Sequence, residues 1–216
     1  MHLISVNIGK PERISLGTRE TTTGIRKQPA DGPVEIGRLG IADDAVMDTA
    51  VHGGPDQAVY VFGGADYDWW SAELGETLAP GTFGENLTIA GLESADCAIG
   101  DRLAIGDKLV LEVTAPRIPC AVLAHRMRDP QFIKRYRDAE RPGLYVRVIA
   151  EGTAQAGDAV TVTPVTGERV TARELFRDNY AKEHAAEDLR RFLSVPLAER
   201  MRAAKQELLD RLTSAG

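Results

Sequence analysis

Three Gly-Asp pairs, each placed just before a short apolar run, constrain the fold of this chain more than any other feature. They stand at residues 99–101 (Ile-Gly-Asp), 105–107 (Ile-Gly-Asp) and 156–158 (Ala-Gly-Asp). Glycine and aspartate are favoured in tight turns, so each pair predicts a turn that leads into a strand. Short strands separated by such turns are typical of β-barrels and β-sandwiches. The expected strands are 2–8, 58–62, 86–90, 102–105, 108–114, 144–150 and 159–163.

The composition changes near residues 164–167 (Pro-Val-Thr-Gly). Before this point we expect helices only at 65–75, 120–128 and 130–139. After it the chain is rich in Ala, Leu, Arg and Glu and has no glycine before its last residue. We therefore predict a mainly β protein with some helix: a β-barrel domain at 1–165 with peripheral helices, and a small three-helix domain at 168–214.

The C-terminal helices carry their own signals. Thr171 and Glu174 have the spacing of a capping box, which predicts a helix from there to about residue 178. A second helix is expected over about 184–193, and a third from Pro196 onward. The third helix has one apolar stripe, which is formed by Leu197, Met201, Ala204, Leu208 and Leu212. This stripe fits packing on the barrel as well as it fits a homodimer interface.

Charge and composition exclude several classes of protein. The formal net charge of −6 argues against a protein that coats nucleic acid, so we expect no nucleic-acid partner. No apolar run reaches 18 residues and residues 1–8 lack the pattern of a signal peptide, so we expect neither a membrane span nor a leader. Two cysteines make no disulfide framework. We therefore expect a soluble, cytoplasmic protein.

Cys120 has the clearest chemical signal. Pro119 suits the first position of a helix, which would place Cys120 in the first turn. The helix dipole and the positive charge of Arg117 both favour a thiolate there. A thiolate is a nucleophile or a ligand for a soft metal, and a buried structural cysteine fits the same local sequence. Cys97 has no comparable setting, so we expect it to be structural.

Three glycine-containing segments are candidates for ligand binding. His52 is followed by Gly53 and Gly54, which let the backbone approach a ligand and leave N–H groups free, although a polar turn fits as well. Residues 23–29 (Thr-Gly-Ile-Arg-Lys-Gln-Pro) place two adjacent cations on a predicted loop, and residues 80–87 (Pro-Gly-Thr-Phe-Gly-Glu-Asn-Leu) fit an anion-binding loop. Neither segment is a Walker loop or a dinucleotide fingerprint.

Five segments in this order resemble the MOSC family, which is named for the C-terminal domain of molybdenum cofactor sulfurase. They are 23–29, 51–59 (Val-His-Gly-Gly-Pro-Asp-Gln-Ala-Val), 80–87, 99–101 and 116–120 (Pro-Arg-Ile-Pro-Cys). The resemblance covers essentially the whole chain and is strongest to the YiiM-type branch, the 6-N-hydroxylaminopurine resistance proteins. One segment departs from that branch, because Ala42 and Asp43 precede Asp44 where the branch usually has a Gly-Asp pair.

The resemblance implies a MOSC-type β-barrel that binds the molybdenum cofactor (Mo-molybdopterin), with Cys120 as the thiolate ligand of molybdenum. It implies a reductase that converts N-hydroxylated compounds, such as hydroxylaminopurines or amidoximes, to amines. Electrons would come from a separate flavin-containing NAD(P)H reductase. Cys120 and His52 are the implied catalytic residues, and the residues expected to bind the cofactor are Arg26, Lys27, His52, Gly53, Gly54, Asn86, Arg117 and Cys120.

Three other functions stay open on the sequence alone. A non-catalytic carrier of the cofactor or of its sulfur would keep the same thiolate but would turn nothing over. A metal-free cysteine hydrolase would pair Cys120 with His52, because such residues meet only in the fold. An interaction module would rely on the C-terminal helices.

Overall fold

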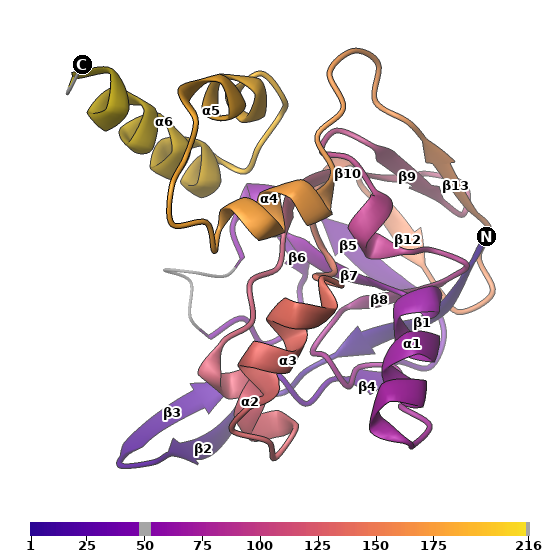
Figure 1. Ribbon diagram of the computed structural model, residues 1–216. Helices are drawn as coiled ribbons and strands as arrows, with labels where there is room; N and C mark the ends of the chain where they lie inside the picture. The colour runs from indigo at the N-terminus through magenta and orange to yellow at the C-terminus, as the bar shows by residue number, and fades with distance from the viewer. Residues whose placement is uncertain (48–52, 215–216) are drawn as a thin grey trace.

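A large curved sheet forms the centre of the computed structural model, which describes residues 1–47 and 53–214 (Figure 1). Its strands are β1 (His2–Ile8), β4 (Gln28–Pro29), β7 (Val59–Gly63), β8 (Leu87–Ala90), β9 (Arg102–Ile105), β10 (Leu109–Pro116), β11 (Leu144–Ala150) and β13 (Val160–Thr163). Each of the seven predicted strands is present, shifted by two residues at most. The glycines of the three predicted turns have positive φ angles, of 91° at Gly100, 57° at Gly106 and 94° at Gly157, as the turns require.

The predicted barrel is not closed by a strand ladder within the described residues. The strand order is β13-β9-β10-β11-β7-β8-β1-β4. Where the two edges approach each other, His2 forms one isolated bridge with Ala159, and the Leu3 N–H donates to the Asp158 carbonyl over 2.8 Å. The free edge of β1 is partly taken by β4, which pairs with Asn7 and Ile8. Only the first residues of β1 therefore remain to contact the segment before β13.

Strand β7 separates two hydrophobic cores. Side chains alternate across a strand, and Val59 and Val61 accordingly belong to the aliphatic core formed with β1, β8, β9, β10 and β11. Tyr60 and Phe62 face the other way, into an aromatic core. Phe62 stacks on Phe83 there, with their ring centroids 4.4 Å apart. The aromatic core reaches from the sheet to α1 (Gly64–Leu74) and α3 (Phe132–Ala139).

The remaining small elements lie around this centre. They are the hairpin of β2 (Glu12–Leu16) and β3 (Arg19–Thr23), the sheet of β5 (Val34–Gly37), β6 (Gly40–Ile41) and β12 (Gly152–Ala154), the helix α2 (Ala121–Arg126), and the 3-10 turns η1 (Pro55–Gln57) and η2 (Ser94–Asp96). The sequence pattern did not predict the β2–β3 hairpin, which projects from one end of the molecule in Figure 1. Within the described ranges, no helix has the length and apolar character needed to cross a membrane.

Three helices follow the sheet: α4 (Ala172–Asp178), α5 (Ala186–Leu193) and α6 (Glu199–Ser214). The predicted capping box is confirmed, because the Glu174 N–H donates to the Thr171 side chain and the Thr171 N–H donates to Glu174. Leu175, Leu189 and Leu209 join the same aliphatic core as the sheet. The helices therefore pack directly on the strands, and a domain boundary near residue 165 stays a prediction.

The predicted apolar stripe of α6 is wrong in the part that follows Met201. Ala204 and Leu212 are exposed, whereas Lys205 and Leu209 are buried. A lysine takes a core-facing position because its ammonium pairs with Asp178, at the end of α4. The buried face of α6 therefore contains Lys205 and Leu209 in place of Ala204 and Leu212.

Candidate functional site

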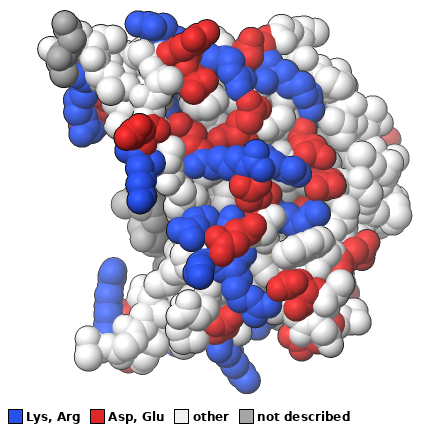
Figure 2. All heavy atoms as spheres, in the orientation of Figure 1, with Lys and Arg blue, Asp and Glu red and all other residues white. Residues whose placement is uncertain are grey.

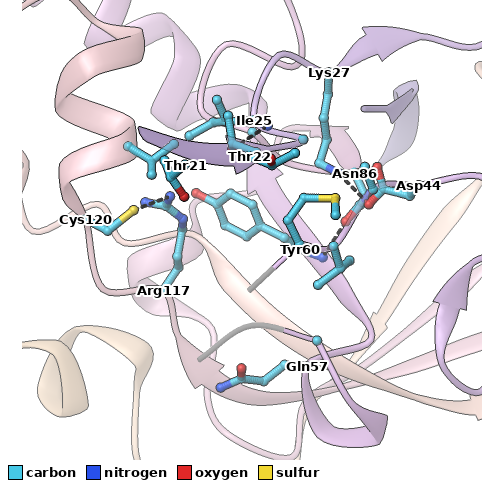
Figure 3. Close-up of a pocket in the computed structure, with 18 of the residues that line it drawn as sticks. Thr21, Thr22, Ile25, Lys27, Asp44, Gln57, Tyr60, Asn86, Arg117 and Cys120 are labelled. Atoms are coloured by element: carbon cyan, nitrogen blue, oxygen red, sulfur yellow. Dashed lines mark hydrogen bonds and ion pairs between the residues drawn. The ribbon is translucent and has the colours of Figure 1, made fainter. Parts of the chain in front are cut away.

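A cavity of about 280 Å³ lies between the β2–β3 hairpin and the large sheet. Its walls come from the hairpin, the loops around residues 24–27 and 44–47, strands β7 and β11, and the start of α2. Figure 3 shows two polar ends separated by the ring of Tyr60. Cys120 and Arg117 lie at one end, and Lys27, Asp44 and Asn86 lie at the other.

The Cys120 end is built by the exit from β10. The strand ends at Pro116, which has no N–H to continue the ladder. The next residue, Arg117, is only 4% exposed and places its Nη2 3.9 Å from the Cys120 sulfur. The guanidinium also lies over the Tyr60 ring, 5.3 Å from its centroid. A cation held so close to the sulfur favours the thiolate form of Cys120.

Cys120 is the N-cap of α2 and has an extended backbone, with φ of −131° and ψ of 170°. The prediction that it lies inside the first turn, with Pro119 at the first helical position, is therefore wrong by two residues, because the first helical residue is Ala121. The Cys120 carbonyl accepts the Leu123 N–H over 3.0 Å, which fixes the helix start, while the sulfur faces the cavity.

Two tyrosines, Tyr60 and Tyr145, line the cavity, and Tyr136 contacts Tyr60. The hydroxyls of Tyr60 and Tyr136 are 3.3 Å apart, and Tyr136 donates to the Pro142 carbonyl over 2.7 Å. Burial raises the pKa of Tyr60 well above its ordinary value, and the neighbouring Tyr136 raises it further. Tyr145 lines the cavity beside them, and burial raises its pKa as well. These phenols therefore stay protonated at neutral pH.

At the opposite end, Lys27 is 7% exposed and forms an ion pair with Asp44. Desolvation lowers the pKa of Lys27, and the Asp44 carboxylate opposes this effect. Asp44 also accepts the Gly9 N–H over 2.8 Å and the Asn86 side-chain amide over 2.9 Å. The carboxylate thus joins three segments that are distant in sequence.

The polar side-chain atoms of Asn86 all form hydrogen bonds within the protein. Its Nδ2 donates to the Asn7 carbonyl over 3.3 Å and to Asp44, and its Oδ1 accepts the Tyr60 N–H over 3.1 Å. The side chain lines the cavity, but both donor hydrogens are used. Asn86 therefore positions the backbone of β7 and the Asp44 carboxylate.

Glycines allow the loops of this end to approach one another. A Cβ on Gly9 would lie 2.1 Å from the Gly24 carbonyl oxygen, and one on Gly24 would lie 2.2 Å from that of Ala45. A Cβ on Gly81 would meet the Lys27 carbonyl at 2.5 Å. The segment 80–87 therefore acts by close packing against the Lys27 loop.

Glu85 holds that segment in place from inside. It is fully buried, and its Oε1 accepts the Tyr67 hydroxyl, the Gly81 N–H and the Thr88 hydroxyl at 2.6, 2.6 and 2.7 Å. Burial raises the pKa of the carboxyl group, and the hydrogen bond from Tyr67 opposes the rise. Its Oε2 has no hydrogen-bond partner in the described residues.

A sequence profile of the MOSC domain matches residues 48–161, a range that contains β7, the 80–87 segment, Arg117 and Cys120. The chain belongs to the MOSC domain family. YflK of Bacillus subtilis is 32% identical over 211 residues, which is 97% of this chain and 95% of that protein. A Gibberella moniliformis protein named "Reductase" is 33% identical over 163 residues, which is 74% of this chain but only 29% of that protein.

The MOSC fold of this chain also matches a solved structure closely. YiiM from Geobacillus stearothermophilus superposes with a TM-score of 0.79 and is 27% identical, and the match covers 96% of this chain and 98% of that chain. The resemblance to the YiiM-type branch that the five segments predicted is therefore confirmed. The solved relative includes the region of the C-terminal helices, so these helices recur with the MOSC sheet.

The structure brings together most of the predicted site residues. Lys27, Gly53, Asn86, Arg117 and Cys120 line one cavity. Gly54 precedes η1, next to the lining, with a positive φ of 82°. Arg26 does not line the cavity and instead pairs with Glu12 over 3.1 Å. His52 lies outside the described residues.

Sequence reasoning missed the tyrosines and the hairpin wall. Thr21, Thr22 and Thr23 of β3 line the cavity together with Arg19. Their signal is a run of polar β-branched residues directly before Gly24, which favours a strand although apolar alternation is absent. Tyr60 lies in a predicted strand, but both faces of that strand are buried, so the sequence does not show that its side chain points toward the cavity.

Proposed function

We propose that this MOSC protein is a molybdenum-cofactor-dependent reductase that converts N-hydroxylated compounds, such as hydroxylaminopurines and amidoximes, to amines. The observation that carries the proposal is the position of Cys120, whose side chain faces a cavity beside a buried arginine. Membership of the MOSC family and similarity to a protein named "Reductase" support it.

The residues that line the cavity fit a metal that is held mainly by a negatively charged organic cofactor. Among the described residues, no group of three His, Cys, Asp or Glu side chains is arranged to hold a metal ion. One cysteine therefore faces the cavity where a protein-only site would need several ligands. Arg117 is buried and its Nη1 has no hydrogen-bond partner in that part of the chain, so the site has a cation available for a negative group.

In this proposal each polar end of the cavity has a separate task. The Cys120 thiolate would ligate molybdenum, a metal that accepts soft sulfur ligands. Arg117 would neutralise charge next to the sulfur, whereas Lys27, which is paired with Asp44, would hold the loops of the far end in place. Gly53 and Gly54 both have positive φ angles, of 70° and 82°, which leaves their backbone close to the cavity without a side chain in the way. When bound there, the cofactor would supply the two electrons that reduce the substrate's N–O bond.

The chemistry consumes two electrons and two protons and yields the amine and water. A separate flavin-containing NAD(P)H reductase would provide the electrons. His52, which directly precedes Gly53 in the sequence, would either hydrogen-bond the cofactor or deliver a proton. Tyr60 would stay a neutral hydrogen-bond donor, since burial raises its pKa.

The first test is metal analysis of protein produced in a molybdenum-replete host. We expect near-stoichiometric molybdenum in the wild type and in the Cys97→Ala control, and none in Cys120→Ala. Equal molybdenum in wild type and Cys120→Ala would contradict the proposal. The second test is reduction of a hydroxylaminopurine with a dithionite-reduced dye. Bound molybdenum without turnover would instead identify a cofactor carrier.

A further inference from the structure

The surface of the molecule has an indentation whose two sides come from different parts of the fold. Figure 2 shows this indentation between the C-terminal helices and the β2–β3 hairpin, with Lys or Arg side chains on both sides. On the hairpin side, Arg19 at the start of β3 lines the cavity. On the helix side, Arg200 in the first turn of α6 reaches the residues around η1.

Arg19 is a cation without a counter-charge in the described structure. Its side chain is exposed, and it makes no hydrogen bond or ion pair with any residue of 1–47 or 53–214. The other cations of this region differ. Arg26 pairs with Glu12, and Arg13 is exposed but does not line the cavity. Of these three arginines, only Arg19 presents its charge to the cavity.

Arg200 is placed by a docked helix start. The Glu199 N–H donates to the Asp56 side chain over 2.9 Å, which fixes the first turn of α6 on η1. Arg200 then donates to the Gln57 side-chain oxygen over 3.3 Å, and Gln57 lines the cavity. A Cβ on Gly54 would lie 4.0 Å from the Arg200 Nη2. The C-terminal helices thus bring a guanidinium group to the cavity rim.

The two buried cations of the cavity lie at its two polar ends. Lys27 is offset by Asp44, and Arg117 lies against the Cys120 sulfur. Among the described residues, the lining nevertheless contains three cations, Arg19, Lys27 and Arg117, and a single carboxylate, Asp44. This local excess occurs in a chain whose net charge is −6. Arginine is suited to phosphate because its planar fork donates two parallel hydrogen bonds.

We propose that Arg19 and Arg200 form a phosphate-binding rim, so that the enzyme acts on N-hydroxylated bases in their nucleotide form in preference to free bases or nucleosides. The inference rests on the proposed function for the reaction. It adds that the base enters the cavity while its 5′-phosphate lies between the hairpin and α6. Arg19 and Arg200 would act on substrate affinity and would not take part in bond breaking.

Binding measured by titration calorimetry tests the rim independently of turnover. The protein, as purified with its bound groups, is titrated with adenosine 5′-monophosphate and with adenosine at low salt. We expect the nucleotide to bind about tenfold more tightly than the nucleoside. Arg19→Gln and Arg200→Gln should each weaken nucleotide binding about threefold or more and leave adenosine binding unchanged. Added salt should reduce the preference, because the rim is exposed.

Matched controls separate the rim from general charge effects. Arg13→Gln removes a cation from the same hairpin, and Arg211→Gln removes one from the same helix, where it pairs with Glu207 on the exposed side. Both controls should keep wild-type binding. Equal affinity for nucleotide and nucleoside in the wild type, or equal effects of Arg19→Gln and Arg13→Gln, would overturn the proposal. Loss of molybdenum from the rim variants would also overturn it, by assigning the arginines to the cofactor's phosphate.

Kinetics link the rim to the reaction. For a 6-hydroxylaminopurine nucleotide, the two rim variants should raise KM and leave kcat unchanged. Absence of turnover with the nucleotide preference intact would reject the reductase and keep the rim. Turnover with no nucleotide preference would reject the rim and keep the reductase.

Discussion

The two polar ends of the cavity hold one buried cation each, but they balance its charge differently. Lys27 is paired with Asp44, and that carboxylate is bonded in turn to Gly9 and Asn86. Arg117 lies over Tyr60 beside the Cys120 sulfur, and its Nη1 has no partner among the described residues. Buried polar groups are normally satisfied, so an unsatisfied one calls for an explanation.

The difference separates structure from binding within one cavity. The Lys27 end ties together loops that contact one another through glycines, and its charges already have partners. The Arg117 end keeps hydrogen-bonding capacity that a negatively charged ligand can use. Substitutions at the first end should therefore reduce stability, and substitutions at the second should reduce ligand binding.

The largest expected effect concerns the reactivity of the two cysteines. Burial raises the pKa of Cys97 to about 12, and the nearby Asp101 carboxylate adds to the rise. At pH 8 only about one Cys97 thiol in ten thousand is then ionised, against about a quarter of ordinary thiols. We expect iodoacetamide to label Cys120 at least about a thousand times faster than Cys97 in native protein. Peptide mass spectrometry of timed samples measures both rates.

Cys120→Ser supplies the control for that experiment, because it should abolish fast labelling without exposing Cys97. Similar rates at the two cysteines would mean that the Cys120 sulfur does not face an accessible cavity. Protein that retains its bound groups should be labelled more slowly than protein from which they have been removed. That contrast would show a ligand on the sulfur.

The next effect compares the two ends directly through stability. Asp44→Asn leaves the buried Lys27 ammonium without its counter-charge, which costs about 3 kcal/mol of unfolding free energy. Arg117→Gln strands no carboxylate and removes one cation–π contact, which costs about 1 kcal/mol. Urea unfolding at pH 7 measures both values. A larger loss for Arg117→Gln than for Asp44→Asn would reverse the assignment of the two ends.

Much of the sheet was predictable from sequence because its strands alternate between two cores. In β7 and β11 every residue from Val59 to Gly63 and from Leu144 to Val146 is buried, and turn residues mark the ends. The β2–β3 hairpin lacks that signal, since β3 reads Arg-Glu-Thr-Thr-Thr and pairs only with β2. A strand that has one neighbouring strand and polar residues along its length lacks the alternation of apolar residues by which strands are predicted.

The candidate site was predictable where its residues are close in sequence. Arg117 and Cys120 are three residues apart, and a proline-flanked helix start brings them together. The two adjacent cations Arg26 and Lys27 could not be distinguished, because neighbours in extended chain point to opposite sides. Only the fold shows that Lys27 points inward. Its pairing with Asp44 depends on the close approach of Gly9, Gly24 and Ala45.

The smallest effect is a pH dependence at the Lys27 end, and it comes from Glu85. Burial raises the folded-state pKa of this carboxyl group above its unfolded value of about 4.5. The folded protein therefore binds a proton more tightly than the unfolded chain does. The stability that this provides is fully present below the unfolded pKa and is lost as pH rises through the folded pKa, at about 1.4 kcal/mol for each pH unit between them.

Glu85→Gln removes this titration and keeps an oxygen that can accept the bonds from Tyr67 and Gly81. We expect the variant to gain stability relative to wild type as pH rises from 4 to 8, because only the wild type then has to bury a charge. Guanidinium unfolding at several pH values measures the difference. A difference that stays constant over this range would mean that Lys27, whose charge favours the ionised carboxylate, cancels the effect of burial. Asp44→Asn in a chain that keeps Glu85 would then remove the competing carboxylate and increase that coupling, which ties the pH response of Glu85 to the charge balance of this end of the cavity.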